Sequence, residues 1–217
     1  MSNKRFIKVA AVSGILACII DFVITYILAT YYPGYSHLTD TMSKLGATNS
    51  PVGKLISGWW LVLCIMLLVF TLGFYLKYKH HGRQVILPTI LIGIYALGEG
   101  MGSGLFPANY VKNGITLSLL IHDTFSGIGV GSIILLPVFM LKLFPRHEFK
   151  SFFVFTLFVS IFGPLMLILF SLAKLYNNPE NIILFYKGLW QRLMMANYYA
   201  YLIVIAVFML SEIKSDK

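Results

Sequence analysis

Charged residues are scarce in this chain. Asp, Glu, Lys and Arg make up 12% of its 217 residues, whereas hydrophobic residues make up 58%, and the mean hydropathy is +0.81. A soluble domain of this length has too little interior to bury so much apolar surface. The composition therefore excludes a soluble globular protein and predicts an integral membrane protein.

Acidic residues are the rarest charged group: 8 Asp and Glu stand against 17 Lys and Arg, which gives a net charge of +9. No polar domain with interleaved basic and aromatic residues is present to hold nucleic acid, so we expect no nucleic-acid partner. The basic excess instead predicts contact with anionic membrane lipids.

Cysteine and histidine are also few. The 2 cysteines, Cys18 and Cys64, fall in apolar runs, which excludes a disulfide framework. A membrane-embedded zinc hydrolase needs several histidines on neighbouring turns, and this chain lacks that pattern. Nucleophile elbows, phosphate-binding loops and dinucleotide motifs are missing as well. The sequence accordingly assigns no metal ligand and no cofactor.

Long apolar runs dominate the chain. A hydrocarbon core about 30 Å thick takes about 20 helical residues. Six runs satisfy this length, near residues 8–31, 57–77, 85–105, 118–142, 151–174 and 190–211. No linker divides them. The sequence thus predicts one all-α domain over residues 1–217, a polytopic membrane bundle of six transmembrane helices.

The distribution of Lys and Arg predicts the orientation. If the amino terminus is inside, eleven of the 17 Lys and Arg residues lie on the inner side. Positive residues are retained there, so we expect both termini to be cytoplasmic. The longest connection, residues 32–56, is then outside. Its segment 39–46 predicts a short interfacial helix, which could bring Asp40 and Ser43 over the bundle as a lid.

Polar residues gather in the outer half of the predicted spans. They are Asp21, Glu99, His122, Asp123 and Arg192. Helical spacing puts Gly14, Cys18, Asp21 and Thr25 on one small, polar stripe facing the bundle. A charge inside a membrane is costly and usually marks function. We therefore expect a shared polar site, with Arg192 as the partner of Glu99; a purely structural ion-pair network is the alternative.

Glycines surround Glu99 in the run Leu97-Gly98-Glu99-Gly100-Met101-Gly102-Ser103-Gly104. Gly98 with Gly102, and Gly100 with Gly104, form two small-xxx-small patterns that permit close helix packing. The same glycines would also weaken the helix enough for its backbone to line a cavity. Close packing is the favoured interpretation.

Three functional hypotheses follow. The leading one is the binding of a lipid-like or small amphiphilic ligand, with Arg192 and His122 meeting an anionic group. The other ligand-binding candidates are Glu99, Asp21, Asp40 and Ser43. The second is a membrane-embedded hydrolase or transferase that uses His122 as a general base, with Asp123 or Glu99 orienting it. The third is a structural or partner-binding protein, including a homo-oligomer joined through small-residue faces.

Several motifs resemble one known family. They are Asp40-Thr41-Met42-Ser43-Lys44-Leu45-Gly46-Ala47-Thr48, Gly104-Leu105-Phe106-Pro107, His122 and Gly188-Leu189-Trp190-Gln191-Arg192. In this order they resemble the domain-of-unknown-function 998 family of membrane proteins. The resemblance implies a six-helix protein of the prokaryotic cytoplasmic membrane and implies no established activity.

Overall fold

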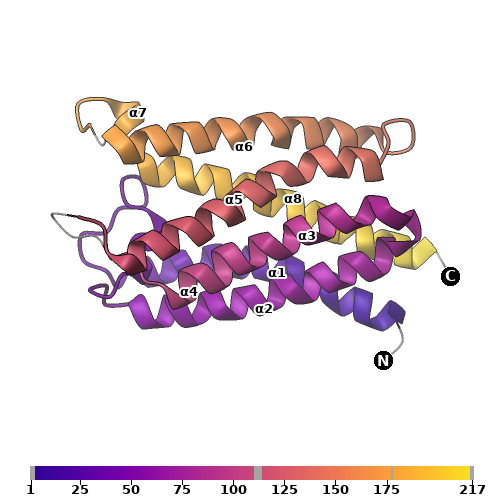
Figure 1. Cartoon of the computed structure of the whole chain (residues 1–217), viewed down its shortest axis with the longest axis horizontal. Coiled ribbons are helices and arrows are strands. Elements are labelled where there is room, and N and C mark those ends of the chain that lie inside the picture. The colour runs from indigo at the N-terminus through magenta and orange to yellow at the C-terminus, as the bar shows by residue number, and fades with distance from the viewer. Residues whose placement is uncertain (1–2, 110–113, 177, 216–217) are drawn as a thin grey trace.

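Every regular element of the chain is a helix, within residues 3–109, 114–176 and 178–215, which the computed structural model describes. The long helices are α1 (Asn3–Ala29), α2 (Gly53–Tyr78), α5 (Leu117–Leu143), α6 (Lys150–Tyr176) and α8 (Lys187–Ser215). They run along one common direction (Figure 1). The predicted all-α bundle is confirmed.

The region Gly53–Leu105 folds back on itself. After α2, a short 3-10 segment, η2 (Lys79–Val85), contains Gly82 with φ of 62°, a left-handed backbone conformation that favours glycine. The chain then returns through α3 (Ile86–Tyr95), a π-helical segment η3 (Ala96–Gly102) and α4 (Ser103–Leu105). All three pack along α2. Figure 1 shows this returning arm beside α2.

Five helical stretches in the described part of the chain are long and apolar enough to cross a membrane. They are α1, the folded-back region Gly53–Leu105, α5, α6 and residues Lys187–Ser211 of α8. The second stretch consists of two arms, which correspond to the predicted spans near 57–77 and 85–105.

The helices form a ring in which each packs on its neighbours. α1 packs on α2 and α8, α2 packs on the α3 arm, the α3 arm packs on α5, and α6 packs on α5 and α8. Packing between α1 and α2 is very close, since a Cβ added at Gly73 would collide with Ala10. By contrast, α5 and α6 diverge toward the end opposite the termini (Figure 1).

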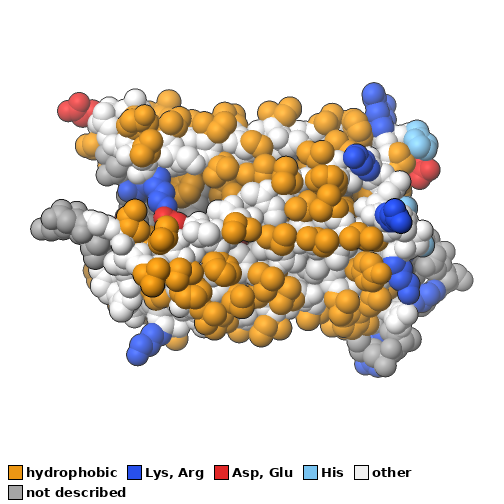
Figure 2. Space-filling model, viewed as in Figure 1, with side chains coloured by type: hydrophobic (Ala, Val, Ile, Leu, Met, Phe, Trp, Pro, Cys, Tyr) orange, Lys and Arg blue, Asp and Glu red, His pale blue; other side chains and the backbone are white. Residues whose placement is uncertain are grey.

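The bundle is apolar both inside and outside. Leu67, Phe70 and Ile92 are fully buried, whereas Ile65 and Ile161 are 62% and 71% exposed. Hydrophobic side chains cover the middle of the surface in Figure 2. A helix that is hydrophobic all round is typical of a membrane span, because its outer face contacts lipid. The molecule is a membrane-embedded helical bundle.

The connection between α1 and α2 contains one short 3-10 helix, η1 (Met42–Gly46), whose Met42 and Leu45 are buried. A further short helix, α7 (Ile182–Phe185), precedes α8 at the same end of the molecule. Cys18 and Cys64 are free and buried.

Candidate functional site

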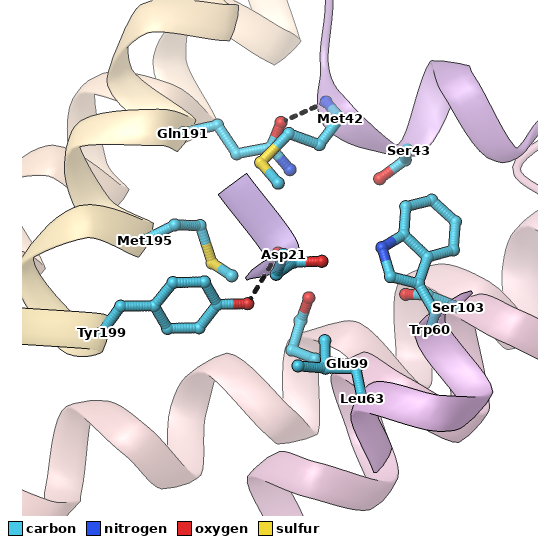
Figure 3. Close-up of a pocket in the computed structure, with 10 residues that line it drawn as sticks. All are labelled: Asp21, Met42, Ser43, Trp60, Leu63, Glu99, Ser103, Gln191, Met195 and Tyr199. Atoms are coloured by element: carbon cyan, nitrogen blue, oxygen red, sulfur yellow. Dashed lines mark hydrogen bonds between the residues drawn. The ribbon is translucent and has the colours of Figure 1, made fainter. Parts of the chain in front are cut away.

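Two adjoining cavities lie near the end of the bundle opposite the termini. The smaller has a volume of about 20 Å³ and lies among α1, η1, α2, η3 and α8. The larger, about 290 Å³, lies among η3, α5, α6 and α8. Ser43, Glu99, Gln191 and Met195 line both. Figure 3 shows the smaller cavity, with side chains from several helices directed toward one space.

Asp21 provides one wall of the smaller cavity. Its side chain is 1% exposed, and its two carboxylate oxygens accept hydrogen bonds from the Trp59 indole at 2.8 Å and the Tyr199 hydroxyl at 2.9 Å. Gly14, Cys18 and Thr25 are buried on the same face of α1, as the helical spacing predicted. The donors on Asp21 are thus neutral groups from α2 and α8.

Glu99 lies at the junction of the two cavities because η3 is packed tightly on both sides. A Cβ at Gly98 would lie 2.5 Å from the Phe125 carbonyl oxygen of α5, and one at Gly100 would lie 2.5 Å from the Cys64 Cβ of α2. These glycines serve close helix packing, the interpretation favoured from the sequence. The π-helical turn widens the backbone at this point. Between the glycines, Glu99 Oε1 accepts a hydrogen bond of 2.6 Å from Ser126.

An ion pair lies at the edge of the larger cavity. Lys174 Nζ of α6 is 3.0 Å from Asp123 Oδ2 of α5, and the two side chains are 37% and 42% exposed. Figure 2 shows a hollow between α5 and α6, with basic and acidic side chains in it. The lining of this cavity also includes the apolar side chains of Leu167, Phe170 and Met194.

Arg192 lies outside both cavities, and its predicted pairing with Glu99 is wrong. Its guanidinium donates to the backbone carbonyls of His37, Asp40 and Gly188 at 2.7, 3.0 and 2.9 Å, and to the Tyr35 hydroxyl at 2.6 Å. The reason is helical geometry. Gln191, Met195 and Tyr199 share the cavity face at intervals of four residues, and the next residue, Arg192, points about 100° away.

The segment 35–43 is thereby held against α8. Burial raises the pKa of Tyr35 to about 12, and burial together with the Arg192 charge lowers the pKa of His37. The Gln191 side chain accepts a hydrogen bond from the Met42 amide at 2.7 Å. This contact places Met42 and Ser43 in the cavity wall.

Asp40 does not reach either cavity. Its carboxylate binds Lys44 Nζ at 2.7 Å and accepts from the Ser36 amide at 3.0 Å. The carboxylate therefore stabilises its own loop, and of the two loop residues proposed for the site only Ser43 lines a cavity.

His122 also lies apart from the cavities. It is 1% exposed, its Nδ1 is 2.8 Å from the Phe106 carbonyl oxygen, and its Nε2 is buried with no hydrogen-bond partner. Its hydrogen bond thus ties α5 to the segment after α4 and involves neither Asp123 nor Glu99. The structure brings together Asp21, Glu99, Asp123 and Ser43 around the two cavities and leaves Arg192, His122 and Asp40 outside.

Trp59, Gln191 and Lys174 were not assigned to the site from the sequence. Gln191 could have been found from its four-residue spacing to Met195 and Tyr199. Trp59 carries no such signal, because a tryptophan in an apolar span is ordinarily a packing or interfacial residue. Among the residues that the structure describes, no three His, Cys, Asp or Glu side chains are grouped closely enough to hold a metal ion.

Comparison with known proteins assigns the chain to a family. Neither the curated proteins nor the solved structures include a match to the chain. A family model described as a protein of unknown function, DUF998, matches residues 15–208. That range includes α2, α5 and α6 completely, residues 15–29 of α1 and residues 187–208 of α8, and it covers both cavities. The chain therefore belongs to the DUF998 family.

Proposed function

We propose that this protein binds a lipid-like amphiphile in the two adjoining cavities. The observation that carries the proposal is the larger cavity, of about 290 Å³, which combines polar groups near Glu99 and Asp123 with an apolar wall from α6 and α8. Ligand sites of this kind pair apolar surface with a few placed polar groups. An amphiphile has the matching division into a headgroup and a chain.

The divergence of α5 and α6 supports entry from the side. Gly127 and Gly131 of α5 line the larger cavity, and a Cβ added at either would meet nothing within 4 Å. These two glycines keep the space free, unlike Gly98 or Gly100, whose lack of a side chain allows close packing. A lateral opening would let an acyl chain enter directly from the membrane.

We propose six membrane spans, with α2 and the α3 arm each crossing once. Both termini lie at one end of the bundle (Figure 1), where most of the Lys and Arg side chains visible in Figure 2 are found. Positive residues favour the cytoplasmic side, so the cavities would face the outer leaflet. By the family resemblance, the membrane is the prokaryotic cytoplasmic membrane.

A cavity-filling substitution tests the proposal. We expect the wild-type protein, extracted in mild detergent and analysed by native mass spectrometry, to carry a bound amphiphile. Gly127→Leu and Gly131→Leu should each remove it, because the leucine side chain would occupy the cavity. Neither change should unfold the helix, since leucine is a better helix former than glycine by several tenths of a kcal/mol or more.

Gly58→Leu is the matched control. Gly58 lies in α2, lines neither cavity, and likewise has nothing within 4 Å of an added Cβ. This variant should retain the amphiphile. The proposal is overturned if the leucine variants of α5 retain as much bound amphiphile as Gly58→Leu, or if the wild type neither carries nor takes up any amphiphile.

A further inference from the structure

Two carboxylates from different helices face the smaller cavity without a cation between them. Asp21 of α1 and Glu99 of η3 both line this space, and Figure 3 shows them directed toward one another. The groups that donate to them are the Trp59 indole, the Tyr199 hydroxyl and the Ser126 hydroxyl. These donors satisfy hydrogen bonds but supply no positive charge.

The basic side chains nearby are engaged elsewhere. Arg192 donates to backbone carbonyls, Lys44 binds Asp40, and Lys174 binds Asp123 at the cavity edge. Lys174 is the only basic residue among those that line either cavity in the described part of the chain. The polar groups of the inner lining thus comprise two carboxyl groups and neutral hydrogen-bonding side chains, next to apolar residues such as Leu63.

A buried carboxylate of this kind is stabilised by a charged donor. Removing an ionised group from water is costly unless it is paired and hydrogen-bonded. A primary ammonium group has three N–H donors and one positive charge, so one such group could serve both carboxylates.

The size of the cavity restricts the choice further. A volume of about 20 Å³ admits about one water-sized group. A primary ammonium is of that size, whereas a phosphate or a trimethylammonium group is considerably larger. The larger cavity, which shares Glu99 and Met195 with the smaller one, would hold the rest of the molecule.

We propose that the amphiphile bears a primary ammonium group, which lies between Asp21 and Glu99. This inference rests on the function proposed above and narrows its ligand class. It replaces the expectation from the sequence that Arg192 and His122 would meet an anionic headgroup, because both side chains lie outside the cavities. Two sources have the required chemistry, a long-chain amine and an aminophospholipid.

A lipid panel tests the proposal on the wild-type protein. The probes are phosphatidylethanolamine, phosphatidylcholine and phosphatidylglycerol with identical acyl chains, added to delipidated protein and quantified by native mass spectrometry. We expect phosphatidylethanolamine to bind about tenfold more tightly than the other two, a difference of about 1.4 kcal/mol. Dodecylamine and dodecanol distinguish the sources. Displacement of the bound lipid by dodecylamine alone assigns the recognition to the amine, whereas displacement by neither assigns it to the whole aminophospholipid headgroup.

Glu99→Gln should abolish the preference for the amine while phosphatidylcholine still binds. Glu180→Gln makes the same chemical change at an exposed residue that lines neither cavity, and it should leave the preference intact. Equal binding of the three lipids to the wild type, or a full preference in Glu99→Gln, would contradict the ammonium site and leave the proposed function standing. Binding of no lipid would contradict the proposed function itself.

Discussion

Arg192 and Glu99 are both costly residues inside a membrane span, and each is stabilised in a different way. Arg192 is 5% exposed and donates to three backbone carbonyls and one hydroxyl, so its charge is stabilised by dipoles within the protein. Glu99 has a hydroxyl donor at 2.6 Å and an adjoining cavity. The two terminal nitrogens of Arg192 have acceptors within the protein, although its buried Nε has no hydrogen-bond partner. Glu99, by contrast, adjoins a cavity with room for a partner.

Replacement of Arg192 should therefore affect stability more than binding. Arg192→Gln removes donors from the carbonyls of His37 and Asp40, and hydrogen bonds from a charged group contribute about 1.5 to 3 kcal/mol each. We expect a clear drop in the thermal unfolding temperature, with the lipid preference of the folded fraction unchanged. A variant that unfolds at the wild-type temperature but has lost its amphiphile would show instead that Arg192 binds the ligand.

The π-helical segment η3 packs closely on two helices and still directs the carboxyl group of Glu99 into a cavity. Gly98 and Gly102 contact α5, while Gly100 contacts α2. With glycine on both sides, η3 is wedged between two helices, and the Glu99 side chain is directed into the space that remains. Close packing and a position in a cavity wall, which were alternatives in the sequence, coexist in the structure.

Gly98→Ala tests this packing. The added Cβ would lie 2.5 Å from the Phe125 carbonyl oxygen and 2.7 Å from the Gly129 Cα, both backbone atoms that cannot move aside easily. Overpacking of this kind costs about 1 to 3 kcal/mol. We expect a lower unfolding temperature and a weaker hydrogen bond between Ser126 and Glu99.

Gly93→Ala, on the same arm, is the control. There the nearest atom to an added Cβ is the Thr71 methyl at 3.6 Å, which is ordinary contact. This variant should be as stable as the wild type. If both alanine variants unfold alike, tight packing of η3 is not what holds the segment in place.

The whole molecule is asymmetric from one end to the other. One end has both termini and most of the basic residues seen on the surface, and the other has the two cavities with the segment 35–46 beside them (Figures 1 and 2). The positive-inside rule predicts that the end with the basic residues faces the cytoplasm. With the proposed orientation, the binding site would face the outer leaflet.

Cysteine labelling of intact cells tests that orientation. The native cysteines, Cys18 and Cys64, are buried, so an introduced cysteine can be followed. A membrane-impermeant maleimide should label Asn49→Cys, an exposed position in the connection between α1 and α2. It should label His147→Cys, in the connection between α5 and α6, only after the cells are opened. The reverse pattern would place the cavities on the cytoplasmic side.

The sequence by itself determined the class of the protein and the positions of its helices. Hydropathy and span length depend on composition along the chain, and these are local properties. The inward stripe of α1, with Asp21, also followed from helical spacing alone. Family membership could likewise be recognised from the order of short motifs.

Only the tertiary structure decided which polar residues meet. The sequence predicted a similar depth for Asp21, Glu99, His122, Asp123 and Arg192, but depth leaves the rotation of each helix and the direction of each side chain undefined. A rotation of about 100° per residue separates Gln191, in the cavity wall, from Arg192, which holds the loop. The carboxylate of Glu99, for which the sequence indicated Arg192 as the partner, instead has Ser126 and an adjoining cavity, because the glycines around it fix the position of η3 between α2 and α5.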